Sequence, residues 1–335
     1  MAKRKSSIRK RRKASVIPAE TTLRYTIPGD GTEVYIDLMR DISRINRRGM
    51  NQGQVVHIQD ITLKQDSADQ VKGLEATFKT APLTWVAAQA YMKGREAWSL
   101  QQRNVRQETG QTGIRPAYED FKIYLDAAHA DGGVVLDPED SAGNPYAAGE
   151  WNISKFVVAF DDEIDPNKVL EPTIHLIGLD NGSSTVSPPT ITSVGLIKAY
   201  EDSRATVSAG QPNVPGTANY NIYTLMTSGQ DEGVAKEVIA NMEDENDSPP
   251  YDIDNYPGGP VNGPTVTDKA LVRTSASNPI VHCGGFASMC GLLKIFSQGK
   301  NVETGANVAL PGVLLITLAP GPKKGLLSLN VGDLV

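Results

Sequence analysis

The residues most able to do chemistry lie at the very start of the chain, where eight of the first thirteen are basic and none is acidic. These eight cations are Lys3, Arg4, Lys5, Arg9, Lys10, Arg11, Arg12 and Lys13. Lysine and arginine at this density neutralise phosphates and release counterions, which gives tight binding to nucleic acid without sequence preference. The segment therefore predicts non-specific binding of a polyanion. The same residues are also typical of a nuclear localisation signal.

The rest of the chain carries the opposite charge. With those eight set aside from the 33 Lys+Arg, 25 bases remain against 39 Asp+Glu, a net charge of −14. A body that acidic repels a polyanion, whereas a cellular nucleic-acid-binding module would spread basic residues over its folded part. Residues 1–20 also lack hydrophobic periodicity, so we expect a disordered nucleic-acid-binding arm joined to a folded domain at residues 21–335.

A second group of cations is predicted on a short helix. Asp37 is placed to cap that helix, Leu38, Ile42 and Ile45 form its apolar side, and Gly49 is expected to end it. Its other side carries Arg40, Arg44, Arg47 and Arg48. Two interpretations stay open: a second phosphate-binding surface, or an ordinary solvated basic face.

No motif indicates catalysis. The chain has no phosphate-binding Gly-Lys-Ser/Thr loop, no Gly-x-Ser-x-Gly turn and no His-Glu-x-x-His pair. Cys283 and Cys290 are too widely spaced for a zinc knuckle and have no second pair, so they are expected to be buried structural thiols. We therefore expect a protein that is not an enzyme and needs no cofactor.

Two acidic clusters could offer oxygen ligands to Ca²⁺ at a subunit contact, residues 137–140 and 161–165. Neither matches the twelve-residue calcium loop, and solvated acidic loops are the simpler interpretation. An enzyme that uses Asp161 or Asp252 with a metal remains the alternative of a different class.

Alternating apolar residues predict about ten to a dozen strands, among them residues 54–65, 71–80, 121–125, 151–160 and 191–200. One long helix is expected over residues 82–107, and an acidic Pro/Gly-rich surface loop over about 228–264. No strand–helix–strand rhythm appears. The predicted class is all-β, an antiparallel jelly-roll sandwich with one inserted helix and long loops.

Membrane insertion is not expected, because no apolar run approaches the roughly 20 residues of a spanning helix. The basic start lacks the apolar stretch of a signal peptide, so we also expect a protein that is not secreted.

Taken together, the basic arm, the strand-rich body, the segment Phe121-Lys122-Ile123-Tyr124-Leu125 after a long helix, and Pro249-Pro250-Tyr251-Asp252 followed by Tyr256-Pro257-Gly258 carry a resemblance. The chain resembles capsid proteins of small viruses with circular, Rep-encoding single-stranded DNA genomes, in particular environmental and marine members.

The resemblance implies a jelly-roll subunit that assembles with copies of itself into an icosahedral shell and packages single-stranded DNA with its arm. It also implies contact with the host nuclear import machinery, residence in the host nucleus during assembly, and a final location in the virion. The capsid of a small RNA virus and a cellular nucleic-acid-binding protein remain alternatives.

Overall fold

The computed structural model of the chain describes residues 18–65, 72–113, 118–160, 168–182, 190–203 and 265–334. The eight arm cations and the predicted acidic loop at 228–264 lie outside these residues. Strands dominate the described part, arranged in several sheets that are mainly antiparallel.

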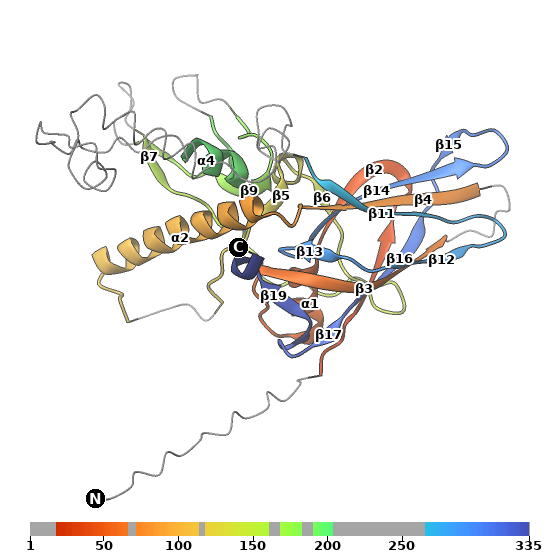
Figure 1. Cartoon of the computed structure of the whole chain (residues 1–335), viewed down its shortest axis with the longest axis horizontal. Coiled ribbons are helices and arrows are strands. Elements are labelled where there is room, and N and C mark those ends of the chain that lie inside the picture. The colour runs from red at the N-terminus through yellow and green to blue at the C-terminus, as the bar shows by residue number, and fades with distance from the viewer. Residues whose placement is uncertain are drawn as a thin grey trace, which may run out of the picture.

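Two antiparallel sheets form the larger half of the molecule (Figure 1). The first has the strand order β1 (Thr22–Ile27), β16 (Gly312–Leu318), β3 (Gln54–Gln65) and β12 (Ile280–Gly284). The second has the order β11 (Thr267–Arg273), β4 (Lys72–Thr80), β14 (Leu292–Asn301) and β2 (Asp30–Asp37). Short strands extend them: β13 (Ala287–Met289) and β19 (Ser328–Asn330) on β3, β15 (Asn307–Val308) on β14, and β6 (Val134–Val135) on β2.

The pairing of these eight longer strands is nested. In chain order, the first strand pairs with the eighth, the second with the seventh, the third with the sixth and the fourth with the fifth. All four pairs are antiparallel. The chain therefore runs out and back like one long hairpin that is folded over on itself.

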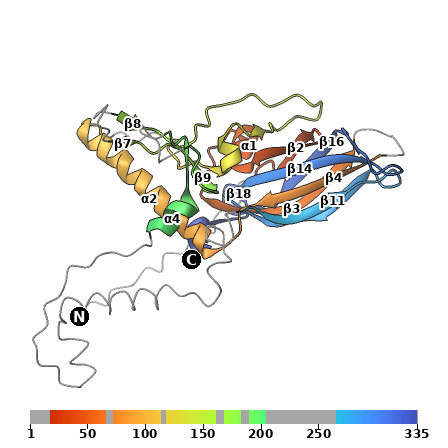
Figure 2. The same cartoon turned by 90° about the horizontal axis from the view of Figure 1, so that it is seen from above.

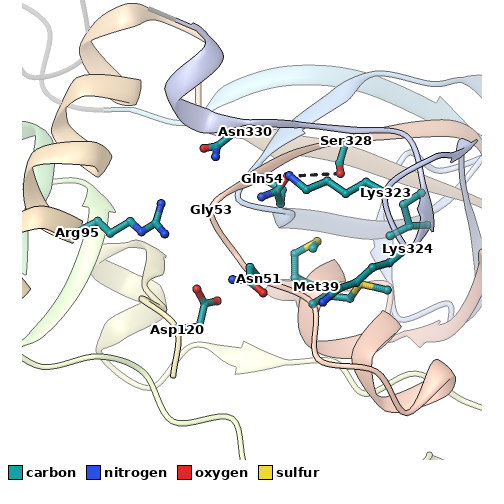
Figure 3. Close-up of a pocket in the computed structure, with 12 residues that line it drawn as sticks. Met39, Asn51, Gly53, Gln54, Arg95, Asp120, Lys323, Lys324, Ser328 and Asn330 are labelled. Atoms are coloured by element: carbon teal, nitrogen blue, oxygen red, sulfur yellow. Dashed lines mark hydrogen bonds between the residues drawn. The ribbon is translucent and has the colours of Figure 1, made fainter. Parts of the chain in front are cut away.

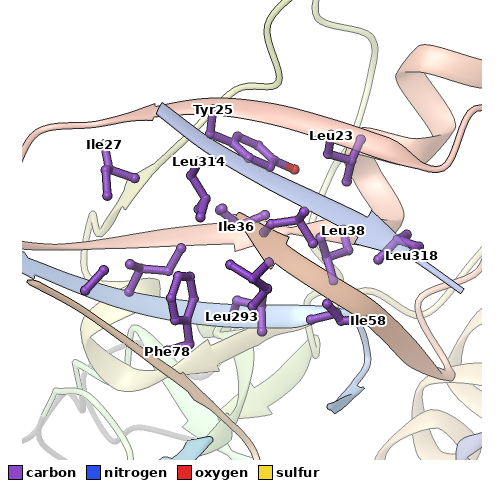
Figure 4. Close-up of a cluster of buried hydrophobic side chains, with 14 of the residues drawn as sticks. Leu23, Tyr25, Ile27, Ile36, Leu38, Ile58, Phe78, Leu293, Leu314 and Leu318 are labelled. Atoms are coloured by element: carbon purple, nitrogen blue, oxygen red, sulfur yellow. The ribbon is translucent and has the colours of Figure 1, made fainter. Parts of the chain in front are cut away.

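The main core fills the space between the two sheets (Figure 4). On β1 the side chains of Leu23, Tyr25 and Ile27 are fully buried and alternate with more exposed neighbours. They face Phe78 of β4 and Leu293 of β14, which are also fully buried. Period-two alternation is what a strand with one buried face requires, so the sequence pattern and the packing agree here.

The segment between β4 and β11 forms a second part, to the side of the sheets (Figures 1 and 2). It contains α2 (Trp85–Glu108), α3 (Ala127–Ala130) and α4 (Leu196–Ser203). A small parallel sheet has the order β10 (Ser193–Gly195), β9 (Thr173–Ile177) and β5 (Tyr124–Asp126), and a hairpin pairs β7 (Val158–Phe160) with β8 (Lys168–Leu170). The short helix η2 (Val331–Leu334) closes the chain against α2.

This side part has its own hydrophobic core, which includes Tyr91, Phe121, Ile174 and Ile197. Helix α2 contacts α4 closely at Gly94, where a Cβ atom would lie 2.6 Å from the Leu196 side chain. A glycine inside a helix costs about 1 kcal/mol relative to alanine, and this close contact explains why one is present.

Several strand predictions are confirmed, and three are wrong in whole or in large part. Of the predicted strand at residues 121–125, only Tyr124 and Leu125 lie in a strand, β5. β3 has the predicted bounds, and its register with β16 shifts beside Asp60, where the apolar pattern changed phase. Residues 191–200, predicted as one strand, form the three-residue β10 followed by α4. Of residues 151–160, only the last three form a strand. The preceding residues make single hydrogen bonds to loops and α2 and one isolated bridge, from Lys155 to Thr173 of β9, rather than a continuous ladder.

Helix α1 (Leu38–Asn46) begins where the sequence predicted, with the Asp37 carboxylate accepting hydrogen bonds from the backbone N–H groups of Met39 and Arg40. It ends before Gly49, because Arg47 takes the left-handed conformation (φ 50°) and caps it. In the described ranges, no helix has both the length and the apolar character needed to cross a membrane.

Candidate nucleic-acid interface

The point at which the arm joins the body is well defined. Pro18 accepts a hydrogen bond from Arg48 Nη1 at 2.9 Å. Two residues on, the backbone of Glu20 makes two hydrogen bonds with the Asn46 side chain, at 2.8 and 2.9 Å. These bonds attach the start of the described chain to the C-terminal end of α1. The arm therefore leaves the body beside Arg47 and Arg48.

The two arginines nearer the start of α1 are engaged inside the body. Arg40 lies 2.8 Å from the Asp41 carboxylate and 3.2 Å from that of Asp137, and it also donates to the Leu136 carbonyl. Arg44 pairs with the same Asp137 at 2.6 Å. Both arginine side chains are only about a tenth exposed. Their charge is balanced within the chain and holds the loop around Asp137 against α1.

Two buried carboxylates support this ion-pair network. Asp41 accepts hydrogen bonds from Arg40 Nε at 2.8 Å and from the Tyr25 hydroxyl at 2.7 Å. Burial nevertheless raises the pKa of Asp41 to about 7, because desolvation of the charged form outweighs both donors. Burial also raises the pKa of Asp37, whose Oδ2 atom accepts from Trp151 Nε1 at 2.8 Å.

The two arginines at the end of α1 have a different environment. Arg47 and Arg48 are exposed, and among the described residues neither forms an ion pair. Within the described ranges, the one hydrogen bond of the Arg48 guanidinium is to the neutral Pro18 carbonyl. Both therefore keep a net positive charge that is available to an anion from outside.

Two lysines add to this charge from the other end of the chain. Lys323 and Lys324 form the tip of a tight hairpin between β17 (Pro320–Gly321) and β18 (Gly325–Leu326). Lys324 donates to the Gly49 carbonyl, directly after Arg48, and Lys323 donates to Gln54 Oε1. In the part of the chain that the structure describes, no carboxylate pairs with either lysine. We call Arg47, Arg48, Lys323 and Lys324 the exit cluster.

A cavity of about 290 Å³ lies beside the exit cluster (Figure 3). Lys323 and Lys324 line one side and Arg95 of α2 reaches in from the opposite side, above Asp120. Asn51 and Gln54 lie between them. Burial raises the pKa of Asp120, against the pull of the Gln52 N–H bond and of Lys122 and Arg95. Burial also lowers the pKa of Lys323, and Lys324 adds to this while Asp333 opposes it.

Two of the four residues of the exit cluster were singled out from the sequence. The arm cations lie outside the described residues, so their role stays a prediction. Of the four predicted helix arginines, the structure brings Arg47 and Arg48 to the arm exit and gives Arg40 and Arg44 acidic partners. Lys323 and Lys324 were not singled out, although Pro-Gly-Pro-Lys-Lys-Gly at residues 320–325 is a turn sequence that presents cations at its tip.

The predicted acidic ligands have internal partners. Asp137 pairs with the two arginines, Glu139 accepts from the Thr26 hydroxyl at 2.9 Å, and Asp140 accepts from backbone N–H groups of its own loop. Within the described ranges no three His, Cys, Asp or Glu side chains converge as a metal site. Residues 161–165 and Asp252 lie outside those ranges. Both cysteines are free; Cys290 is buried as predicted, whereas Cys283 is only partly buried.

Compared with protein-family models, with curated proteins and with solved structures, the chain matches none. The strand pairing and the distribution of charge described above are therefore the features that bear on its function.

Proposed function

We propose that this chain is the subunit of a self-assembling protein shell that packages single-stranded nucleic acid, as the resemblance to capsids of small circular single-stranded DNA viruses implies. The observation that carries the proposal is the arm exit. A segment with eight cations joins an acidic body beside the exit cluster, four exposed cations that form no ion pair among the described residues.

The strand pairing supports a jelly roll as the fold of this subunit. An eight-stranded jelly roll is a double sheet built from two Greek keys, which places partners from opposite ends of the chain side by side. The nested pairing, with β1 beside β16 and β2 beside β14, has this character. The part between β4 and β11 would then be an insertion in one of the loops that connect the strands of the jelly roll.

Exposed apolar side chains favour contacts between subunits. On the outer half of α2, Leu100 is 53% exposed and Val105 is 51% exposed. These two side chains are five positions apart, so they lie on different sides of the helix. A second copy of the chain is the partner that the proposal assigns to this exposed half of α2.

The charge distribution favours packaging over recognition of a particular sequence. Lysine and arginine in an unstructured arm bind phosphate without reading bases, and packaging needs binding of this kind. The acidic remainder of the body keeps the polyanion at the arm side. In a eukaryotic host the same arm would act as a nuclear import signal, which places assembly in the nucleus.

Electron microscopy of the purified full-length chain, with absorbance at 260 and 280 nm on the same fraction, tests the proposal. We expect closed, uniform particles that contain nucleic acid, and digestion of the extracted acid with DNase or RNase distinguishes a DNA genome from an RNA genome. A monodisperse monomer that does not assemble would contradict the proposal and favour a cellular nucleic-acid-binding protein.

A further inference from the structure

The cavity beside the exit cluster has the size of a site for one small ligand. Its volume of about 290 Å³ is near the lower end of the roughly 300–1,000 Å³ that small-molecule sites occupy. The walls come from separate parts of the chain: the first turn of α1, the loop before β3 and the start of β3, Arg95 of α2, Asp120 before β5, the β17–β18 hairpin, and β19. Such a site is fixed by the fold rather than by one flexible loop.

The cations of the cavity are suited to a phosphate group. Lys323 and Lys324 form hydrogen bonds only to neutral carbonyl oxygens, those of Gln54 and Gly49. Their two positive charges lie side by side in sequence, and among the described residues no carboxylate forms an ion pair with either. Burial lowers the pKa of Lys323, the charge of Asp333 opposes this shift, and Lys324 adds to it. A bound phosphate would supply an anion to both lysines.

The remaining polar groups are suited to the edge of a base. Asp120 Oδ2 accepts the Gln52 N–H at 2.8 Å, and the backbone N–H of Phe121 also stabilises its charged form. The carboxylate lines the cavity and has further lone pairs with which to accept. Gln54 Oε1 is occupied by Lys323 and Ser328, so its amide nitrogen remains to donate (Figure 3). Asn51 offers one donor and one acceptor group, and the planar Arg95 guanidinium is of the kind on which bases stack.

An acidic side chain in a cationic cavity selects among ligands. A carboxylate only accepts hydrogen bonds, so Asp120 favours a base with an exocyclic amino group, as in adenine, cytosine or guanine. Thymine and uracil present carbonyl oxygens there instead. A bare inorganic anion would gain nothing from Asp120.

We propose that this cavity seats one nucleotide with an amino-bearing base, its phosphate on Lys323 and Lys324 and its base edge against Asp120 and Gln54. The inference rests on the proposed function, because a packaged strand is the source of that nucleotide. It adds a base preference at one position to an interface that otherwise binds only phosphates.

The test measures binding of dAMP, dCMP and dTMP to the full-length chain by saturation-transfer NMR, at a salt concentration that screens the arm. We expect dAMP and dCMP to bind roughly tenfold more tightly than dTMP. Asp120→Asn, whose amide oxygen can still accept the Gln52 N–H, should remove this preference. Lys323→Gln with Lys324→Gln should weaken all three ligands, and Lys155→Gln, an exposed cation that pairs with Glu171, is the matched control.

Equal affinity for the three nucleotides, or binding unchanged in the double lysine variant, would overturn the inference. Circular dichroism of each variant confirms that it is folded. If nucleotides fail to bind but particles still contain nucleic acid, the cavity assignment fails alone. If nucleotides bind with the expected preference but the chain never assembles, the cavity stands and the packaging proposal fails.

Discussion

Helix α1 and the residues directly after it carry the same residue type, arginine, in opposite roles. Within the helix, Arg40 and Arg44 lie within 3.2 Å of carboxylates and their side chains are about nine-tenths buried. After its end, Arg47 and Arg48 are exposed and have no acidic partner among the described residues. Four arginines spaced to share one helical surface are therefore divided into two that hold the fold and two that remain free.

The division is set by residues far away in the chain. Asp137, which neutralises Arg40 and Arg44, comes from the loop after β6, more than ninety positions from the helix. Lys323 and Lys324, which join Arg47 and Arg48, come from the last hairpin. What a cation does is thus decided by whether the fold brings an acid to it or another cation.

The largest effect is expected from the arm itself. Deleting residues 1–13 removes eight cations, so the slope of log affinity against log salt for single-stranded DNA should become shallower by about 5 to 6. Fluorescence anisotropy with an oligonucleotide at several salt concentrations measures the slope. The circular dichroism spectrum should stay the same. An unchanged slope would show that the body, not the arm, binds the strand.

Substitution of one buried and one exposed arginine shows which of them stabilises the fold. Arg40→Met leaves the buried Asp41 carboxylate with the Tyr25 hydroxyl as its only remaining side-chain donor, and should lower the free energy of unfolding by about 3 kcal/mol. Arg47→Met, on the exposed end, should change it by less than about 0.5 kcal/mol. Urea denaturation of both variants measures the difference. Equal effects would mean that the ion-pair network does not stabilise the fold.

The sequence predicts where strands lie better than it predicts which cations remain unpaired, and the reason is physical. Period-two burial is a local pattern, so β3 was placed at its observed bounds and the α1 start at Asp37. The strand prediction over 191–200 failed, because Leu196 and Ile197 are apolar enough for either element and become helical where they pack on α2. Tertiary contacts decide such ambiguous segments.

The candidate interface was predicted only in part, because its members meet through long-range contacts. Arg47 and Arg48 were singled out by their helical spacing. No local pattern connects Lys323 or Lys324 with them, and none shows that Asp137 removes Arg40 and Arg44 from the surface. Apart from Arg47 and Arg48, only the density of cations in the arm, which needs no fold, could be predicted from the sequence.

A smaller effect is expected in the pH dependence of the free energy of unfolding, through the buried carboxylate of Asp41. The pKa of Asp41 is raised from 3.8 to about 7, so between these values the folded chain keeps a proton that the unfolded chain releases. The contribution of Asp41 to the free energy of unfolding is therefore fully present at low pH and decreases as pH rises through that window, by a few kcal/mol at most. Denaturant titrations of the wild type and of Asp41→Asn measure this as a pH-dependent difference. A difference that is the same at both ends of the window would contradict it.

The most direct measurement of the central claim compares two sets of four cations in single-stranded DNA binding. In one variant the exit cluster, Arg47, Arg48, Lys323 and Lys324, is changed to glutamine. In the matched variant the four are paired surface cations, Lys79, Lys155, Arg273 and Lys300. We expect the salt slope to become shallower by about 3 in the first variant, because each cation contributes about 0.7, and to stay near the wild-type value in the second. Equal slopes in the two variants would show that the exit cluster is not part of the interface.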